Sequence, residues 1–140
     1  MKVSLVIPAH NQEKYIGECI ESILETSSGR EQETEIIVID NASTDRTKEI
    51  ANKYPNVRVI YEPRKGLTRA RQRGLIEATG NLVGYIDADS RVPATWLNTA
   101  LTEFSRRPNM ICLRGPFRYH YLPWFDKFFA EIGWYLFAPL

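Results

Sequence analysis

Two aspartates two residues apart, Asp87 and Asp89, follow the apolar run at residues 82–86. Residues i and i+2 of an extended chain point to the same side, so both carboxylates could face one point. Like charges that close repel each other and raise one pKa unless a cation neutralises them. Hard oxygen ligands suit Mg²⁺ or Mn²⁺, and a substrate phosphate could complete the coordination shell. The alternative interpretation is a solvated turn that carries two surface acids.

A basic segment lies between Arg64 and Arg73, with five basic residues and no acidic one. Its Gly66 lets the backbone approach a ligand, and the start of the helical pattern that follows favours anions. Arginine side chains suit bidentate contacts to phosphate. Alone, the segment could equally be a solvated helix face, whereas beside a metal-binding acid pair it favours a diphosphate. The net charge of +1 and the acidic strand ends argue against nucleic acid.

The elements that must position these residues alternate between short apolar runs and amphipathic helical patterns. This alternation predicts an α/β fold, with a Rossmann-like, mostly parallel sheet flanked by helices. The predicted strands cover residues 3–8, 36–40, 57–61, 82–86 and 110–113. The predicted helices cover residues 13–25, a stretch ending near 54, and residues 66–79, 93–107 and 124–136. Gly80 is predicted to end the third helix as its C′ residue.

Three of the predicted strands end in polar residues. His10 follows the first strand, Asp40 and Asn41 end the second, and Asp87 and Asp89 follow the fourth. Parallel sheets of this type bind ligands beyond the carboxyl ends of their strands. Each polar end alone could be a turn, a helix cap or a surface acid. If the fourth strand returns beside the first, all of them meet in one cleft, which predicts a binding site there.

Composition and missing motifs narrow the class of protein. The 140 residues are 44% hydrophobic, typical of one globular domain, and no run is long enough to span a membrane. Cys19 and Cys112 are too few for a disulfide framework and are predicted to be buried free thiols in a reducing compartment. No Gly-x-Gly-x-x-Gly follows the first strand, and P-loop and Gly-x-Ser-x-Gly motifs are absent. His10 and His120 with two distant cysteines do not form a zinc pattern.

Four segments in order resemble the family-2 glycosyltransferases of the GT-A fold. They are VSLVIPAHNQE (3–13), EIIVIDNASTDRT (35–47), RKGLTRAR (64–71) and DAD (87–89), and the resemblance covers about residues 2–115. It implies a nucleotide-diphosphate sugar as donor, most often a UDP- or GDP-sugar, with Mg²⁺ or Mn²⁺ as cofactor. It also implies transfer with inversion at the anomeric carbon to a saccharide or lipid acceptor, in the cytoplasm or at the cytoplasmic face of a membrane.

The resemblance also implies residue roles within the donor site. Asp89 would bind the metal that bridges the diphosphate, and Asp87 would lie near the ribose. Asp40 would accept a hydrogen bond from the base, and Arg69 and Arg71 would lie near the base or the diphosphate. The base pocket would be lined by Pro8, Ala9 and His10, with Glu13 close by.

The sequence departs from the family pattern in three respects. His10 replaces a frequent aromatic residue, and Gln12 and Gln72 replace a frequent Glu and Asn. No catalytic residue is assigned, because the family takes its general base from the second half of the domain, normally well beyond residue 140. Residues 1–115 are therefore predicted to be the donor-binding domain of an inverting glycosyltransferase. The alternative is a nucleotide-binding module or remnant without transferase activity.

Ten of the sixteen aromatic residues lie between Phe117 and Leu140. Residues 116–140 are predicted to form a helical tail that begins the acceptor half of the domain. Two interpretations of this tail remain open. It packs in a core or in an interface, including self-association, or it forms an interfacial helix that lies on a membrane.

Overall fold

The computed structural model describes residues 1–113 of the chain. Its elements follow in the order β1 (Val3–Ala9), α1 (Ile16–Thr26), β2 (Thr34–Asp40), α2 (Thr47–Ala51), β3 (Val57–Tyr61), α3 (Leu67–Glu77), β4 (Leu82–Tyr85) and α4 (Trp96–Arg106). Residues 1–106 form one compact unit, and residues 107–113 belong to a second unit that is described by itself. The predicted helix at 124–136 and tail at 116–140 lie outside the described residues.

The four strands form one parallel sheet in the order β3-β2-β1-β4. Leu5 of β1 pairs with Ile36 of β2 on one side and with Gly84 of β4 on the other. The predicted parallel α/β sheet is therefore confirmed, and β4 does return beside β1. Consequently the carboxyl ends of β2, β1 and β4 are neighbours at one edge of the sheet.

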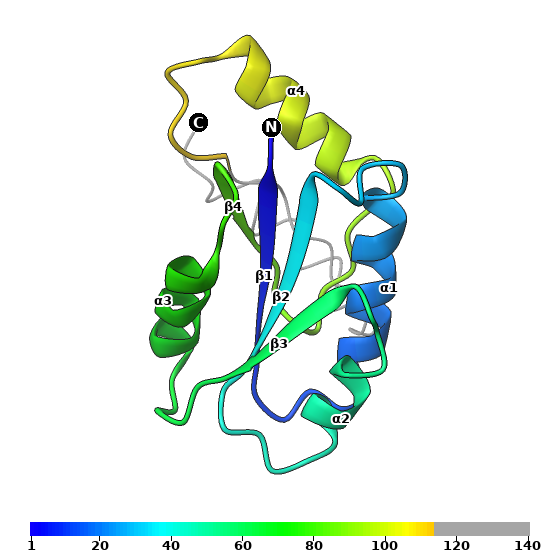
Figure 1. The fold of residues 1–140 in the computed structure, drawn as a ribbon, viewed down its shortest axis with the longest axis vertical. Helices are drawn as coiled ribbons and strands as arrows, with labels where there is room; N and C mark the ends of the chain where they lie inside the picture. The colour runs from blue at the N-terminus through cyan, green and yellow to red at the C-terminus, as the bar shows by residue number, and fades with distance from the viewer. Residues whose placement is uncertain (114–140) are drawn as a thin grey trace, which may run out of the picture. The chain divides into compact units, whose positions relative to one another are not determined.

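Helices cover both faces of this sheet, with α3 on one side and α1 and α2 on the other (Figure 1). All seven residues of β1 and the last five of β2 are buried. Strands covered on both faces need continuous apolar runs rather than alternation, which these two sequences provide. One core joins Leu5, Ile7 and Val38 to α1, and the other joins Val6 and Ile37 to α3.

Glycines allow close packing at two points beside the sheet. A Cβ atom on Gly74 of α3 would lie 2.2 Å from Cγ1 of the buried Val6, so the helix approaches the sheet because no side chain is present. Gly80 does not end α3 as predicted, since the helix ends at Glu77 and Ala78 is already extended. A Cβ on Gly80 would instead lie 2.6 Å from the backbone nitrogen of Ser4, so Gly80 lets the turn into β4 lie against β1.

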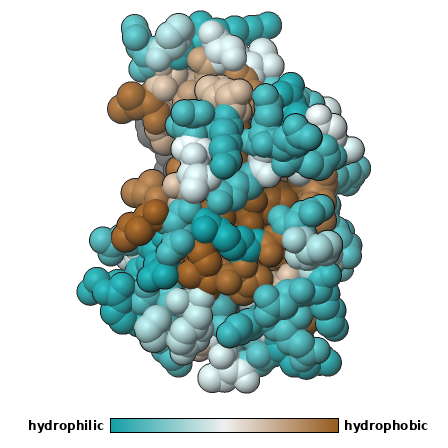
Figure 2. All heavy atoms as spheres, viewed as in Figure 1, coloured by the Kyte–Doolittle hydropathy of each residue, from teal (hydrophilic) through white to brown (hydrophobic). Residues whose placement is uncertain are grey.

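Other predictions fail for the described residues. The helical pattern of residues 66–79 predicts an inward face made of Leu67, Ala70, Gly74, Leu75 and Ala78. Ala70 and Gly74 are buried as predicted, but the exposed fractions of Leu67 and Leu75 are 53% and 57%. The surface view shows hydrophobic residues among the hydrophilic ones beside α3 (Figure 2). Residues 110–113 form no strand. Cys19 is buried as expected, but Cys112 is exposed. No helix among residues 1–113 has the length and apolar character needed to cross a membrane.

Candidate functional site

The polar segments after β1, β2 and β4 start from adjacent positions at the carboxyl edge of the sheet. The N–H of Asn41 donates to the carbonyl oxygen of Ala9 at 2.8 Å, which extends the β1–β2 ladder. On the other side of β1, the N–H of Ile86 donates to the carbonyl oxygen of Val6 at 3.0 Å. The predicted meeting of three strand ends is thus present. We call the polar residues gathered there the strand-end site: His10, Asp40, Asn41, Arg69, Arg71, Asp87 and Asp89.

The loop after β1 is tied to the loop after β2. Asn11, with a positive φ of 53°, accepts the N–H of Thr44 at 2.8 Å through its Oδ1. Its own N–H donates to Oγ of Ser43 at 3.1 Å. The N–H of Gln12 donates to Oγ1 of Thr47 at 2.7 Å. These contacts fix the two loops to each other before any ligand binds, and we call the set, together with Glu13 and Asp45, the loop clamp.

Two acids complete the loop clamp. Asp45 Oδ2 accepts the N–H of Glu13 at 3.0 Å, and Glu13 Oε2 accepts the N–H of Arg46 at 3.2 Å. Burial would raise the pKa of Asp45, but hydrogen bonds from Thr47 and Glu13 outweigh it and hold the pKa below its usual range. Glu13, predicted to lie close to the base pocket, is therefore engaged in joining the two loops.

Of the three residues predicted to line the base pocket, only His10 is exposed, because Pro8 and Ala9 are buried in β1. His10 Nδ1 lies 2.7 Å from the carbonyl oxygen of Asn41. A carbonyl oxygen only accepts, so Nδ1 carries the proton, and Nε2 of the neutral ring is an acceptor. Asp40 is buried, and its Oδ1 accepts the N–H of Ser43 at 3.2 Å.

The two aspartates that follow β4 occupy a turn rather than the extended segment assumed from the sequence. The N–H of Ser90 donates to the carbonyl oxygen of Asp87 at 2.9 Å, which closes the turn. Asp87 is half-buried and pairs with Arg71, whose Nη2 lies 3.1 Å from Oδ1. Asp89 is exposed and forms no ion pair within residues 1–113. The two carboxylates therefore have different surroundings, because Asp87 has a cationic partner and Asp89 has none among the described residues.

A buried thiol lies beneath this turn. The thiol of Cys19 donates to the carbonyl oxygen of Asp87 at 3.6 Å. Burial, and then the negative charges of Asp89 and Asp87, raise the pKa of Cys19 to about 12. Both carboxylates therefore act on the same thiol, so their charges are concentrated in one region of the site.

A divalent metal fits the oxygen donors of this turn, although they do not form a complete site. Among residues 1–113, no group of three or more His, Cys, Asp or Glu side chains could hold a metal ion. Mg²⁺ is commonly bound through one or two carboxylates, with waters and substrate phosphates as the other ligands. The exposed carboxylate of Asp89 suits such binding, whereas Asp87 already has Arg71 as a partner.

The arginines expected near the ligand come from α3. Tyr85 of β4 donates its hydroxyl to the carbonyl oxygen of Arg71 at 3.0 Å, and the Arg71 guanidinium lies 5.9 Å from the centroid of the Tyr85 ring. These contacts and the ion pair with Asp87 fix Arg71 beside the end of β4. Arg69 is exposed and has no ion-pair partner among the described residues, so it is available to an anionic ligand.

Glu62, in the loop between β3 and α3, is a buried acid that the sequence did not single out. Its side chain is 1% exposed, and Oε1 accepts Nε of Arg64 at 2.8 Å. Hydrogen bonds from the side chain and backbone N–H of Arg64 lower the pKa of Glu62 to about 2. The signal in the sequence was a lone acid between a strand and a basic segment, which also fits a solvated loop.

We expect Glu62→Gln to remove a pH-dependent part of the stability. A carboxyl whose pKa is lowered by folding stabilises the protein fully above its usual pKa, and this contribution is lost as the pH falls toward its folded pKa. The difference in unfolding free energy between wild type and Glu62→Gln should therefore be constant above ~pH 5 and shrink toward ~pH 2. Urea unfolding followed by circular dichroism at several pH values would measure it, and a difference that does not change with pH would contradict it.

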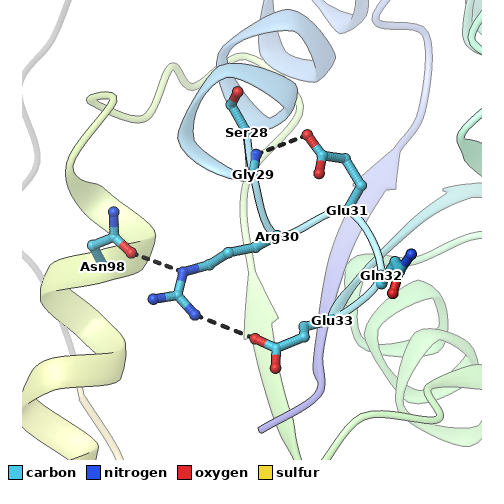
Figure 3. Close-up of a pocket in the computed structure, with 7 residues that line it drawn as sticks. All are labelled: Ser28, Gly29, Arg30, Glu31, Gln32, Glu33 and Asn98. Carbon is cyan, nitrogen blue, oxygen red and sulfur yellow. Dashed lines mark hydrogen bonds and ion pairs between the residues drawn. The ribbon is translucent and has the colours of Figure 1, made fainter.

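A surface pocket elsewhere offers a contrast with the strand-end site. It is lined by the loop from Ser28 to Glu33, which precedes β2, and by Asn98 of α4 (Figure 3). Arg30 donates from Nε to Asn98 at 3.0 Å and from Nη1 to Glu33 at 3.2 Å. Arg30, the arginine of this pocket, is thus paired. The pocket lies at the amino ends of the strands, away from Asp87 and Asp89.

A model of glycosyl transferase family 2 matches residues 4–127. The chain belongs to glycosyl transferase family 2. This family-2 chain is 36% identical over 105 residues to the glycosyltransferase YibD of Escherichia coli strain K12. The aligned region covers 72% of this chain and 30% of YibD. It is 30% identical over 115 residues to the chondroitin synthase of Pasteurella multocida strain Pm70. The aligned region covers 79% of this chain and 12% of the synthase. The family-2 chain thus spans less than a third of either relative.

Solved glycosyltransferases share the fold of this family-2 chain. TarS of S. aureus in complex with UDP is similar with a TM-score of 0.72 and 27% identity, covering 84% of this chain and 39% of TarS. The mannosyltransferase PcManGT of Pyrobaculum calidifontis, solved with GDP-Man and Mn²⁺, has a TM-score of 0.68 and 26% identity, covering 82% and 36%. The predicted GT-A type of α/β fold is therefore confirmed.

Proposed function

We propose that the strand-end site binds the nucleoside diphosphate of a UDP- or GDP-sugar, and that residues 1–115 are the donor-binding part of an inverting glycosyltransferase. The observation that carries the proposal is the meeting, at one sheet edge, of His10, of the Asp87–Asp89 turn and of the arginines of α3. The complexes of TarS with UDP and of PcManGT with GDP-Man and Mn²⁺ support it.

The proposed roles are those that the resemblance to the family implies, combined with the contacts of each side chain in the structure. His10 presents Nε2 and its ring to the base, and the buried Asp40 accepts a hydrogen bond from the base. Asp87, oriented by Arg71, accepts from a ribose hydroxyl. Asp89 would hold Mg²⁺ or Mn²⁺, which when bound supplies positive charge to the diphosphate as the bond to the sugar breaks. Arg69 and Arg71 add fixed positive charge on the α3 side.

Nucleotide titration tests this proposal. We expect UDP or GDP to bind the wild-type chain in the presence of Mn²⁺, and to bind at least ~10-fold more weakly in EDTA, because the diphosphate then loses a cation that stabilises it. Isothermal titration calorimetry gives both dissociation constants. If neither nucleotide binds in Mn²⁺, the donor-site proposal fails.

The second candidate function is a nucleotide-binding module without transfer. It differs from the first proposal only in that the bound sugar nucleotide is not turned over. One observation favours it: each acid of the described strand-end site has a proposed binding role, so none of them is left to act as general base. Incubating the chain with UDP-glucose or GDP-mannose and Mn²⁺ and following release of UDP or GDP separates the two. Sustained release contradicts the module interpretation, and binding without release supports it.

A further inference from the structure

Asn41 lies where the parts of the strand-end site meet, and all of its polar groups form hydrogen bonds. The residue is 3% exposed. Its N–H donates to Ala9 at 2.8 Å, and its carbonyl oxygen accepts Nδ1 of His10 at 2.7 Å. The backbone of Asn41 therefore orients the imidazole that we propose contacts the base.

The side chain of Asn41 holds the loop between β3 and α3. Nδ2 donates to the carbonyl oxygens of Glu62 at 3.1 Å and Arg64 at 2.8 Å, which uses both of its hydrogens. Oδ1 accepts the N–H of Gly66 at 2.8 Å. One amide thus satisfies three backbone groups that lie 21 to 25 residues away in the sequence. Without it, buried backbone groups would lack partners, which is costly.

Gly66 transmits this attachment to α3. It is the N-cap residue of the helix, with a φ of 131°, and its carbonyl oxygen accepts the N–H of Ala70 at 3.1 Å. The side chain of Arg69 passes close to Gly66, since Cγ would lie 3.9 Å from a Cβ placed there. Fixing the N–H of Gly66 therefore fixes the first turn of the helix and the point from which Arg69 extends.

We infer that Asn41 is a positioning residue of the donor site, which sets the location of Arg69 relative to His10 by joining the end of β2 to the start of α3. This inference rests on the proposed function, because it concerns affinity for the nucleoside diphosphate. A purely structural role would lower the stability of the chain and leave the affinity of the folded molecules unchanged.

The test compares Asn41→Ala with Ser4→Ala, a matched loss of buried hydrogen bonds at the opposite edge of the sheet. Ser4 is fully buried. Its Oγ donates to Glu35 at 2.6 Å and accepts the N–H of Gly80 at 2.8 Å. We expect Asn41→Ala to weaken UDP binding in Mn²⁺ about tenfold, and Ser4→Ala to change it less than about twofold, with both corrected for the folded fraction. GDP replaces UDP if the wild type prefers it.

A double-mutant cycle with Arg69→Gln distinguishes positioning from general loosening. If Asn41 acts through Arg69, the effect of Asn41→Ala on the dissociation constant should fall to about twofold or less in the Arg69→Gln background. If the fold-changes in the dissociation constant from Asn41→Ala and Arg69→Gln multiply in the double variant, the inference is overturned. It is also overturned if Asn41→Ala binds UDP as tightly as Ser4→Ala does. Should Asn41→Ala not fold, Asn41→Ser, which keeps a polar group in the buried position, enters the same cycle with the same expectation.

The two proposals fail in different ways. Absence of binding by the wild type contradicts the donor-site proposal. Binding by the wild type that is insensitive to Asn41 contradicts only the positioning role.

Discussion

Asp89→Asn should weaken the binding of UDP or GDP in Mn²⁺ about 100-fold, or ~2.7 kcal/mol. The substitution keeps the size of the side chain and removes the charge that would attract the cation. Because Asp89 has no ion-pair partner among the described residues, the substitution leaves no Lys or Arg side chain without its partner. Calorimetric titration of wild type and variant, each in Mn²⁺ and in EDTA, measures the effect. The Asn variant in Mn²⁺ should match the wild type in EDTA.

The matched control is Glu33→Gln, which removes an exposed carboxylate near the amino ends of the strands. Glu33 pairs with Arg30 at 3.2 Å on the surface. Exposed ion pairs of this kind contribute little to stability. The affinity of Glu33→Gln for UDP or GDP should therefore equal that of the wild type. If Asp89→Asn retains the full effect of Mn²⁺, the metal role of Asp89 is wrong, even where the nucleotide still binds.

Gly74→Ala should destabilise the fold by ~1–3 kcal/mol, although alanine is the better helix former. The new Cβ would lie 2.2 Å from Cγ1 and 3.2 Å from Cγ2 of Val6. Val6 is fully buried in β1, so neither the strand nor the helix can move aside without disturbing the core. Urea unfolding monitored by circular dichroism gives the change in free energy.

Two further variants test this explanation. Gly17→Ala in α1 places its Cβ 3.3 Å from the hydroxyl of Tyr54, a flexible side-chain end, and we expect it to be neutral or to stabilise the helix. In a Val6→Ala background the clash with Gly74→Ala is relieved, so the cost of Gly74→Ala should be smaller there than in wild type. Equal costs in both backgrounds would show that contact with Val6 is not the cause.

The sheet could be predicted because its signals are local. The apolar runs of β1 and β2 require strands buried on both faces, and the polar residues directly after them mark the carboxyl edge. The side of α3 that faces the sheet was less accessible to such reasoning. Its helical pattern placed the large Leu67 and Leu75 on the inward face together with small residues. Only the prediction for the small residues Ala70 and Gly74 is confirmed, because Val6 and Ile37 already fill the space between helix and sheet.

The positions of the candidate site residues at the strand ends could be predicted from the sequence, but their hydrogen-bond and ion-pair partners could not. Its strand-end residues follow from topology, whereas their partners lie far away in the sequence. Arg71 pairs with Asp87 across 16 residues, and Asn41 reaches Gly66 across 25. The turn at Asp87 replaced the extended segment assumed from alternation, because Ser90 closes it with a backbone hydrogen bond. Hydrogen bonds of this kind depend on the folded arrangement and leave no periodic pattern in the sequence.

The loop clamp has a consequence for the thermodynamics of ligand capture. Gln12, Glu13 and Thr44 donate their backbone N–H groups across the clamp to the other loop, so these segments are ordered in the free protein. Their conformational entropy is lost when the chain folds, and a nucleotide does not have to restrict them again. Binding of UDP or GDP should therefore occur with a small entropic penalty from the backbone, in the manner of a preorganised receptor.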